Sequence, residues 1–264
     1  MKFADCHIDT LSYIYDKNMS LVKNKAHVDL ERINKFEDYF ALWAVFIHPK
    51  YDKPKKRALD IINYSLNIFP LSIENCSCFE KLEDIEMFYN LGVRMGTLVW
   101  NTDNNIIANS KVTDYGVEVI KEMERLDMII DVSHASEKAF WDICKYATKP
   151  IFASHSNCYN ITPHKRNLKD EQIKEIFARN GFIGVNLYKE FTGENIVPHV
   201  EHFLELGGEN NIGIGSDFDG CEDFIYDLKG LQDIYIINDI LVKNFGKKIA
   251  DNIMYNNLTK ALTL

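Results

Sequence analysis

The stretch Phe3-Ala4-Asp5-Cys6-His7-Ile8-Asp9 near the start of the chain decides between two competing folds. It has the pattern of a first strand that ends in a histidine and an aspartate two positions apart. Side chains alternate along a strand, so His7 and Asp9 are expected on one face. An imidazole and a carboxylate are two of the ligand types that zinc accepts. By the same alternation, Cys6 is expected to pack outward against helices.

Short apolar runs and stretches of helical periodicity alternate along the rest of the chain. The predicted strands are Phe3–Ile8, Tyr39–Ile47, Leu71–Glu74, Val93–Trp100, Met128–His134, Pro150–His155, Phe182–Leu187 and Asn211–Asp217. The predicted helices are Pro54–Phe69, Glu80–Leu91, Thr113–Leu126, Ser136–Tyr146, Lys169–Asn180, Val197–Leu206, Gly230–Phe245 and Lys247–Leu264. Ser12–Asp38 is polar and is predicted to be loop-like, with a short helix near Leu30–Phe36.

This alternation predicts an α/β fold, a (β/α)8 TIM barrel that forms a single domain over residues 1–264. A doubly wound parallel sheet is the alternative, and it usually carries a glycine-rich phosphate loop after its first strand. Here the first strand ends in His7 and Asp9 instead. The first strand therefore favours the barrel.

Composition limits the classes of function. The 264 residues are 46% hydrophobic and carry a net charge of -9, which argues against nucleic acid as a partner. No apolar run approaches the roughly 20 residues of a membrane span, and the first strand leaves no room for a signal peptide. The six cysteines form no Cys-x-x-Cys pair and are expected to be reduced thiols. A cytoplasmic protein without a membrane partner is expected.

Polar residues gather where the predicted strands end, which in a barrel is the catalytic face. They are His7, Asp9, Glu74, Trp100, Asn101, His134, His155, Tyr188, Asp217 and Asp219. So many ionisable groups in one place are costly without compensating charge, which two divalent cations would supply. Glu74, with two carboxylate oxygens, is then the natural bridge between them.

Taken singly, these residues also have structural interpretations. Glu74 could cap the following helix, and His134 could be a hydrogen-bonded histidine at a strand end. Asp131 could orient a neighbouring group. His48 trails the second strand and is expected at the surface.

The chain resembles the membrane (renal) dipeptidase family of zinc peptidases, within the amidohydrolase-like barrels, although it is shorter than many members. The matching stretches cover nearly the whole chain in the family's order. They are Asp5–Asp9, Ser72–Glu74, Leu91–Arg94, Asp131–His134, Ser154–Asn157, Lys165–Leu168, Ile183–Asn186 and Gly213–Gly220.

The resemblance implies two Zn²⁺ ions per chain. His7 and Asp9 would bind one ion, His134 and His155 the other, and Glu74 would bridge both. A hydroxide held between the metals would then hydrolyse the peptide bond of a dipeptide, with D-residues tolerated at the carboxyl-terminal position. A small dipeptide is the expected substrate partner, and a homodimer stays open.

The resemblance also assigns groups that handle the substrate. Arg166 would hold the terminal carboxylate of the dipeptide in bidentate geometry. Tyr188 would line the pocket wall. Asp217 would act as general base and then acid beside the scissile amide.

One position departs from the family pattern. The renal enzyme has a histidine after strand four, where this chain reads Thr97-Leu98-Val99-Trp100-Asn101. Trp100 can only donate a hydrogen bond, from its indole nitrogen. Trp100 and Asn101 are predicted to contact substrate, Asn101 as a replacement donor; a tryptophan that only packs at the barrel rim is an equal alternative.

The sequence is also compatible with two other functions. The centre could hydrolyse another small amide, such as a lactam or an N-acyl amino acid. The chain could also be a catalytically weak barrel that binds metal or peptide, having lost turnover at Trp100.

Overall fold

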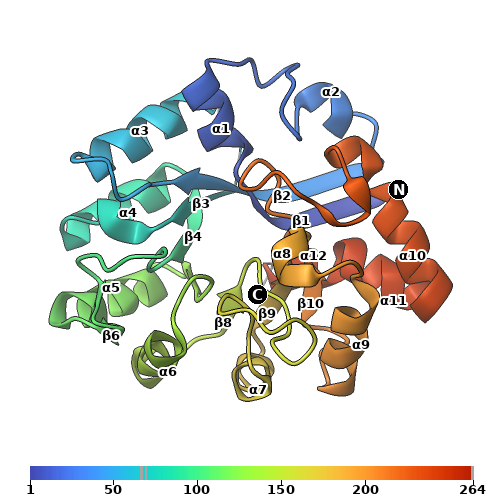
Figure 1. Cartoon of the computed structure of the whole chain (residues 1–264). Coiled ribbons are helices and arrows are strands. Elements are labelled where there is room, and N and C mark those ends of the chain that lie inside the picture. The colour runs from blue at the N-terminus through green and yellow to red at the C-terminus, as the bar shows by residue number, and fades with distance from the viewer. Residues whose placement is uncertain (66–67, 69, 263–264) are drawn as a thin grey trace.

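Eight parallel strands close into a barrel in the order β1-β10-β9-β8-β7-β4-β3-β2 in the computed structural model, which describes residues 1–65, 68 and 70–262 (Figure 1). Their bounds are β1 Lys2–Ile8, β2 Asp38–Phe46, β3 Leu71–Glu74, β4 Val93–Thr97, β7 Ile129–Asp131, β8 Ile151–Ala153, β9 Phe182–Val185 and β10 Ile212–Ile214. The hairpin of β5 (Ile107–Ala108) and β6 (Lys111–Val112) lies outside the barrel sheet. The predicted (β/α)8 barrel is confirmed.

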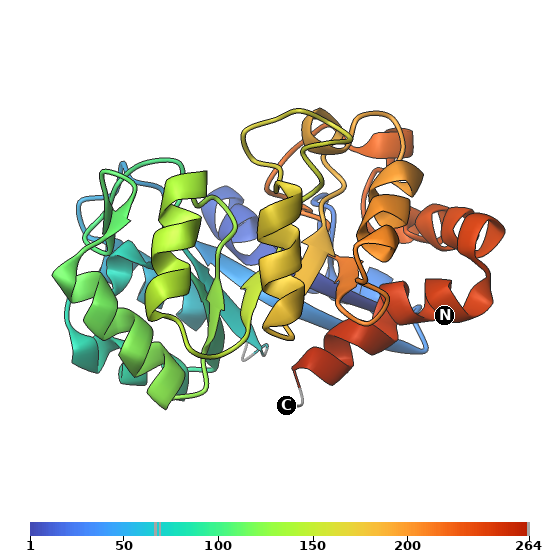
Figure 2. The ribbon, with the colours of Figure 1, turned by 90° about the horizontal axis from the view of Figure 1, so that it is seen from below.

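Helices surround the barrel (Figure 1), and Figure 2, seen from below, shows a row of them in front of the strands. Their bounds are α1 Thr10–Lys17, α2 Leu30–Ile33, α3 Pro54–Tyr64, α4 Leu82–Asn90, α5 Asp114–Arg125, α6 Glu137–Tyr146, α7 Asp170–Ala178, α8 Lys189–Thr192, α9 Val197–Glu205, α10 Tyr235–Phe245, α11 Lys247–Asp251 and α12 Asn257–Ala261. Short turns of other helix types span Cys76–Cys78, Ile225–Asp227, Leu231–Asp233 and Asn252–Asn256. Thr113 and Ser136 cap α5 and α6 with their side chains, as their residue types favour.

Helix α1 corrects the prediction that residues from Ser12 onward are loop-like. It has eight residues and buries Leu11 and Ile14, so its apolar face is too short to show helical periodicity in the sequence. Other differences concern helix ends. The helix predicted from Gly230 begins at Tyr235. Of the helices predicted over Pro54–Phe69 and Lys247–Leu264, residues 66, 67, 69, 263 and 264 lie outside the described residues.

Several predicted strands run past the observed ones at the face where the strands end. The sheet stops at Thr97, Asp131, Ala153 and Ile214, two or three residues before most of the predicted ends. His134 and Asp217 have φ values of 67° and 65°, outside the strand region. The backbone thus leaves the sheet just where polar side chains must turn toward a common centre.

A bulge in β1 places neighbouring residues on the same face. Asp5 pairs with Ala41 and Ile8 with Trp43, so Cys6 and His7 together oppose the single residue Leu42 of β2. Cys6 belongs to a buried cluster of apolar side chains from strands on different sides of the barrel, and only the barrel interior brings these together. They are Ala4, Leu42, Met95, Phe152 and Phe182. The prediction that Cys6 packs outward is therefore wrong.

The barrel closes where β1 meets β10, along a seam that joins the two ends of the sequence. Asp5 pairs with Ile214, and beyond the strands the Asp217 amide donates to the His7 carbonyl at 3.1 Å. The Asp9 amide donates to the Phe218 carbonyl at 2.8 Å. The seam thus fixes the backbone on both sides of His7.

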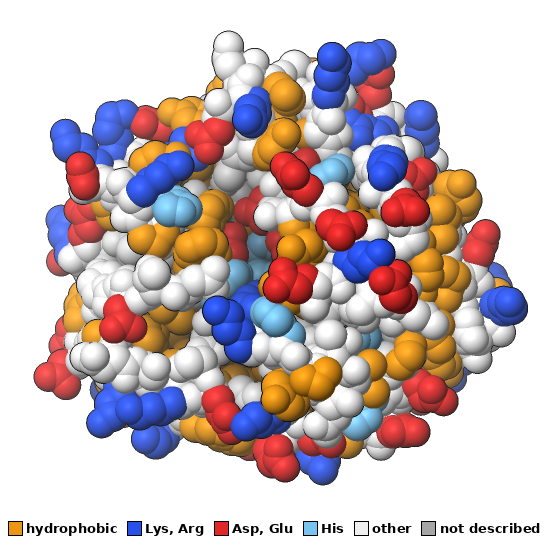
Figure 3. All heavy atoms as spheres, viewed as in Figure 1, with side chains coloured by type: hydrophobic (Ala, Val, Ile, Leu, Met, Phe, Trp, Pro, Cys, Tyr) orange, Lys and Arg blue, Asp and Glu red, His pale blue; other side chains and the backbone are white. Residues whose placement is uncertain are grey.

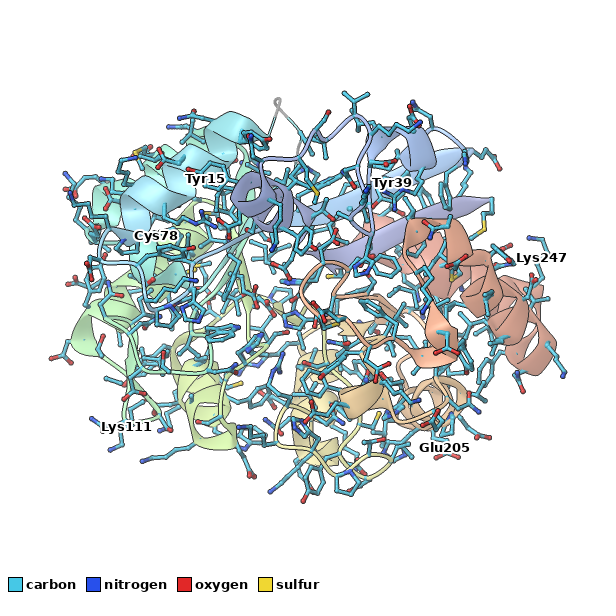
Figure 4. All side chains as sticks on the ribbon, turned by 45° about the horizontal axis from the view of Figure 1, so that its top comes forward. Tyr15, Tyr39, Cys78, Lys111, Glu205 and Lys247 are labelled. Atoms are coloured by element: carbon cyan, nitrogen blue, oxygen red, sulfur yellow. The ribbon has the colours of Figure 1, made fainter. Side chains whose placement is uncertain are left out.

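Charged side chains such as Lys111, Glu205 and Lys247 lie at the periphery of the molecule in Figure 4. Among the described residues, no helix combines the length and apolar character that crossing a bilayer requires. The charged groups of functional interest are instead buried at one end of the barrel.

Candidate metal centre

A cavity of about 670 Å³ opens at the carboxyl ends of the strands. Figure 3 looks into it near the centre of the face, where histidine and acidic side chains lie inside the hollow. Most of the predicted site residues line this cavity. These are Asp9, Glu74, Trp100, Asn101, His134, Arg166, Tyr188, Asp217 and Asp219. His7 and His155 lie just beneath, 0% and 1% exposed.

Glu74 lies between two pairs of ligand atoms. Its Oε2 is 3.7 Å from His7 Nε2, which is 3.2 Å from Asp9 Oδ2. Its Oε1 is 2.9 Å from His134 Nε2 and 3.9 Å from His155 Nε2. The two carboxylate oxygens therefore face different histidines, as a bridge between two ions requires.

The donor set fits divalent metal ions. The Nε2 atoms of His134 and His155 are 2.9 Å apart. Burial lowers the pKa of both histidines well below the ordinary value, and the positive charges of Arg166 and His7 add to this, so both rings are neutral and offer lone pairs. Asp9 Oδ1 is buried and has no hydrogen-bond partner within the described part of the chain. Nitrogen lone pairs and an unpaired carboxylate oxygen in one place are typical ligands of zinc.

The cluster concentrates charge in a dry environment. Burial alone would lower the pKa of His7, but the carboxylates of Asp9 and Glu74 outweigh it and raise the pKa to about 10. Burial raises the pKa of Glu74 well above its ordinary value, with Asp9 adding to the shift. Burial and mutual repulsion therefore disfavour the charged form of the carboxylates in this cluster. Bound cations would stabilise that charged form.

Residue 220 is a glycine, and its lack of a side chain makes room for the carboxylates of Asp9 and Asp217. A Cβ at this position would lie 2.4 Å from both Asp9 Oδ2 and Asp217 Oδ1. Sequence reasoning missed this role, although Gly220 ends one of the stretches singled out above. The signal was a glycine beside two aspartates after the last strand.

The predicted base and carboxylate anchor lie on the side of the cavity formed by β8, β9 and β10. Asp217 Oδ2 accepts a hydrogen bond from Asn186 Nδ2 at 3.0 Å. Arg166 buries its Nε and Nη2 atoms, which find no hydrogen-bond partner in residues 1–65, 68 and 70–262, and its guanidinium lies 5.4 Å from the Phe191 ring. Tyr188 lines the cavity and donates from its hydroxyl to Glu190 Oε2 at 2.9 Å.

Aromatic side chains cover the opposite side. The Trp100 ring lies 5.1 Å from Phe46, 5.4 Å from His48 and 5.8 Å from His134. Trp100 thus both packs at the rim and lines the cavity. His48 is half-buried against this wall. Phe46 was missed because the predicted strand ran past it to Ile47.

Asn101 contacts a predicted metal ligand. Its Oδ1 lies 2.9 Å from His134 Nδ1 and can only accept, so this nitrogen carries the proton and Nε2 keeps its lone pair. The predicted hydrogen bond from Asn101 to substrate stays a prediction and would have to come from Nδ2.

Sequence comparison matches the model of the family "Membrane dipeptidase (Peptidase family M19)" to residues 63–263, more than half of the chain. An uncharacterised protein of the pqqA 5' region of Klebsiella pneumoniae is 32% identical over 204 residues, covering 68% of this chain and 74% of that protein. A dipeptidase of Claviceps purpurea is 30% identical over 199 residues, 67% of this chain and 46% of that protein. The chain spans less than half the length of the fungal dipeptidases that it matches.

Solved structures share the fold at low sequence identity. A metallopeptidase of Rhodobacter sphaeroides, liganded with a phosphinate mimic of the dipeptide L-Ala-D-Ala, has a TM-score of 0.88 and 18% identity, covering 100% and 99% of the two chains. The probable dipeptidase PvdM of Pseudomonas aeruginosa has a TM-score of 0.84 and 16% identity, covering 99% and 94%. The family match and the relatives support a metal-dependent peptide-bond hydrolase, and this chain belongs to the membrane dipeptidase family, Peptidase family M19.

Proposed function

We propose that the chain is a zinc-dependent dipeptidase with two metal ions. The observation that carries the proposal is the placement of Glu74, whose two carboxylate oxygens face separate histidines. His7 and Asp9 would hold one ion, and His134 and His155 the other. Bound there, the ions would supply Lewis-acid activation of water and of the scissile carbonyl.

Arg166 would anchor the substrate by its free carboxylate. Its buried Nε and Nη2 groups have no hydrogen-bond partner among the residues that the structure describes, and burying a charged donor unpaired is costly. A carboxylate would satisfy two of these donors at once, in the planar geometry that suits a guanidinium. The anchor would thereby restrict the site to short peptides that end near the metal ligands.

Asp217 would carry the proton. Burial raises the pKa of this carboxyl, although His7 and the hydrogen bond from Asn186 oppose the shift. Asn186 Nδ2 occupies Oδ2, so Oδ1 remains free to accept a proton from the attacking water. Asp217 would then deliver it to the leaving amine, acting as base and afterwards as acid.

The carboxyl-terminal residue is proposed to be accepted in the D-configuration. The Rhodobacter sphaeroides structure supports this, since its ligand mimics L-Ala-D-Ala. With the carboxylate at Arg166, the other end of the substrate would reach the aromatic side formed by Phe46 and Trp100. In this wall, Trp100 stands where the family has a histidine that contacts the scissile carbonyl. This difference near the carbonyl is the observation that favours hydrolysis of other small amides as a second candidate function.

The remaining parts of the proposal concern the setting. All six cysteines are free and five of them are buried, which supports a reducing, cytoplasmic location. A homodimer stays a prediction that light scattering would test.

Metal analysis and a panel of L,L and L,D dipeptides would test the function, with Glu74→Gln as the variant. Two zinc ions per chain and dipeptide hydrolysis are expected, with metal and activity lost together in Glu74→Gln. Fewer than one ion per chain and an unaffected Glu74→Gln variant would refute the two-metal centre. Zinc-loaded protein that binds dipeptides but cleaves none would instead establish a binding protein.

A further inference from the structure

Asp131 ends β7 beneath the metal centre and is fully buried. Its Oδ1 accepts hydrogen bonds from the backbone amides of Ser133 and Ser154, at 3.0 and 2.9 Å. Its Oδ2 accepts from the hydroxyls of Thr97 and Ser154, at 2.6 and 2.7 Å. Because an ionised carboxylate can only accept, the hydroxyl proton of Ser154 is committed to Asp131.

The hydrogen bond to Asp131 determines which hydrogen bonds Ser154 can form with the histidines above it. Its Oγ lies 2.8 Å from His155 Nδ1 and 3.4 Å from His7 Nδ1. Having given its proton away, the oxygen offers only lone pairs in these directions. Both Nδ1 atoms must therefore carry hydrogen, which leaves the Nε2 lone pair of a neutral ring free to bind metal.

We propose that Asp131 and Ser154 form a buried pair that fixes the tautomer of one histidine in each half of the metal centre. Neither residue is a catalytic residue; both are positioning residues that act through His155 and His7. The inference rests on the proposed two-metal function. It goes beyond that function because it assigns the orientation of the ligands to two side chains outside the ligand set.

The substitution Asp131→Asn reverses the hydrogen bonds without changing the shape of the side chain. The amide oxygen must take the place of Oδ1, because two backbone N–H groups point at it and cannot turn away. The amide nitrogen then faces Ser154 and donates to it. The Ser154 hydroxyl is left to donate toward His155 Nδ1, which favours the tautomer with hydrogen on Nε2 and thereby weakens metal binding.

Ser133→Ala is the matched control for Ser154→Ala. Ser133 is also a buried serine just before a histidine ligand, and its Oγ lies 3.3 Å from Ser154 Oγ. It accepts from the backbone amide of His155 at 3.2 Å, so this contact involves the main chain and not the ring. Both variants lose a hydroxyl from the same hydrogen-bond network, but only Ser154→Ala loses the contact with the imidazole rings. Comparing the two variants therefore isolates the effect of that contact.

Zinc affinity of the metal-stripped full chain, measured by competition with a chelator, would test the inference. Removing a partner that orients a metal ligand typically weakens binding by about 10–100-fold, and this is expected for Ser154→Ala and Asp131→Asn. Ser133→Ala should stay within roughly threefold of the native protein, well below that range. In the zinc-loaded protein labelled with ¹⁵N-histidine, the Nδ1–H resonance of His155 should persist in Ser133→Ala and shift in Ser154→Ala.

The outcomes separate this inference from the proposed function. Native protein that binds no zinc would refute the function itself. Native protein that binds two ions, with Ser154→Ala binding them equally tightly, would overturn the positioning role alone. Ser154→Ala decides the matter even if circular dichroism shows that Asp131→Asn does not fold.

Discussion

The floor of the cavity and its rim are built in different ways. The floor consists of side chains at strand ends, such as His7, Glu74 and His155, that are almost wholly buried and held by the barrel. The rim consists of loop and helix residues, such as Lys165 and Glu190, that are exposed. The fold itself brings the floor together, whereas the rim depends on the course of individual loops. Small substitutions in the floor should therefore weaken metal binding strongly, whereas substitutions in the rim should have a smaller effect on substrate binding.

Gly220→Ala tests the floor and should have the largest effect. The added Cβ would displace the carboxylates of Asp9 and Asp217, and displacements of about 1 Å at a reacting centre can cost on the order of 100-fold in rate. We expect kcat/KM to fall by at least that factor, with a reduced zinc content.

Gly207→Ala is the contrasting control for this prediction. Its Cβ would meet no atom of the described residues within 4 Å, but its φ of 91° penalises a side chain, so thermal stability should fall while kcat is unchanged. Equal loss of activity in both variants would mean that the floor does not depend on the space at Gly220.

Arg166→Met tests the anchor between floor and rim. Hydrogen bonds to charged groups contribute about 1.5–3 kcal/mol, so KM for a dipeptide should rise by roughly 10–100-fold. Zinc content should stay unchanged, as metal analysis would show. A dipeptide amide, which lacks the free carboxylate, should be cleaved equally poorly by both proteins; a large difference there would contradict the anchoring role.

His199 links segments of the chain that lie behind the rim, so a substitution at this position tests what stabilises the rim. It lies on α9, accepts from the Cys158 amide at 3.1 Å and contacts the Thr192 carbonyl at 3.0 Å through Nε2. Burial lowers its pKa to about 4, so the folded protein leaves it neutral at a pH where the unfolded chain binds a proton. Its contribution to stability is therefore present above about pH 6.5 and is lost as the pH falls toward about 4.

The expected change in unfolding free energy across this range is roughly 3 kcal/mol, measured by urea unfolding as the difference between the native protein and His199→Gln. The native protein should lose stability more steeply as the pH falls. Parallel pH profiles for the two proteins would contradict this role for His199.

Trp100→Ala tests the rim and should have the smallest effect. Loss of the aromatic wall should raise KM by about 3–10-fold, as expected for a partly exposed apolar contact. Zinc content should not change, and Trp100→Phe should restore most of the affinity. A lower zinc content in Trp100→Ala would assign Trp100 to the floor, through its packing on His134.

The contrast between floor and rim also explains what could be predicted from the sequence. Glu74 and His155 follow buried apolar runs, so the eightfold pattern was enough to bring them to one face of a barrel. Asn101 and Gly220 lie in loops, and no periodicity indicates that one contacts His134 and the other makes room for Asp9. Cys6 was misplaced because alternation assumes a regular strand, and one extra residue in β1 reverses it.

The seam between β1 and β10 has a consequence for the order of assembly during synthesis. Glu74 ends β3, and His134 and His155 follow β7 and β8, so all three leave the ribosome well before the last strand. His7 and Asp9 are made first, yet their backbone is held by Asp217 and Phe218, which are made late. A nascent chain could thus form one half of the centre early. The other half would be completed only when the last strand arrives.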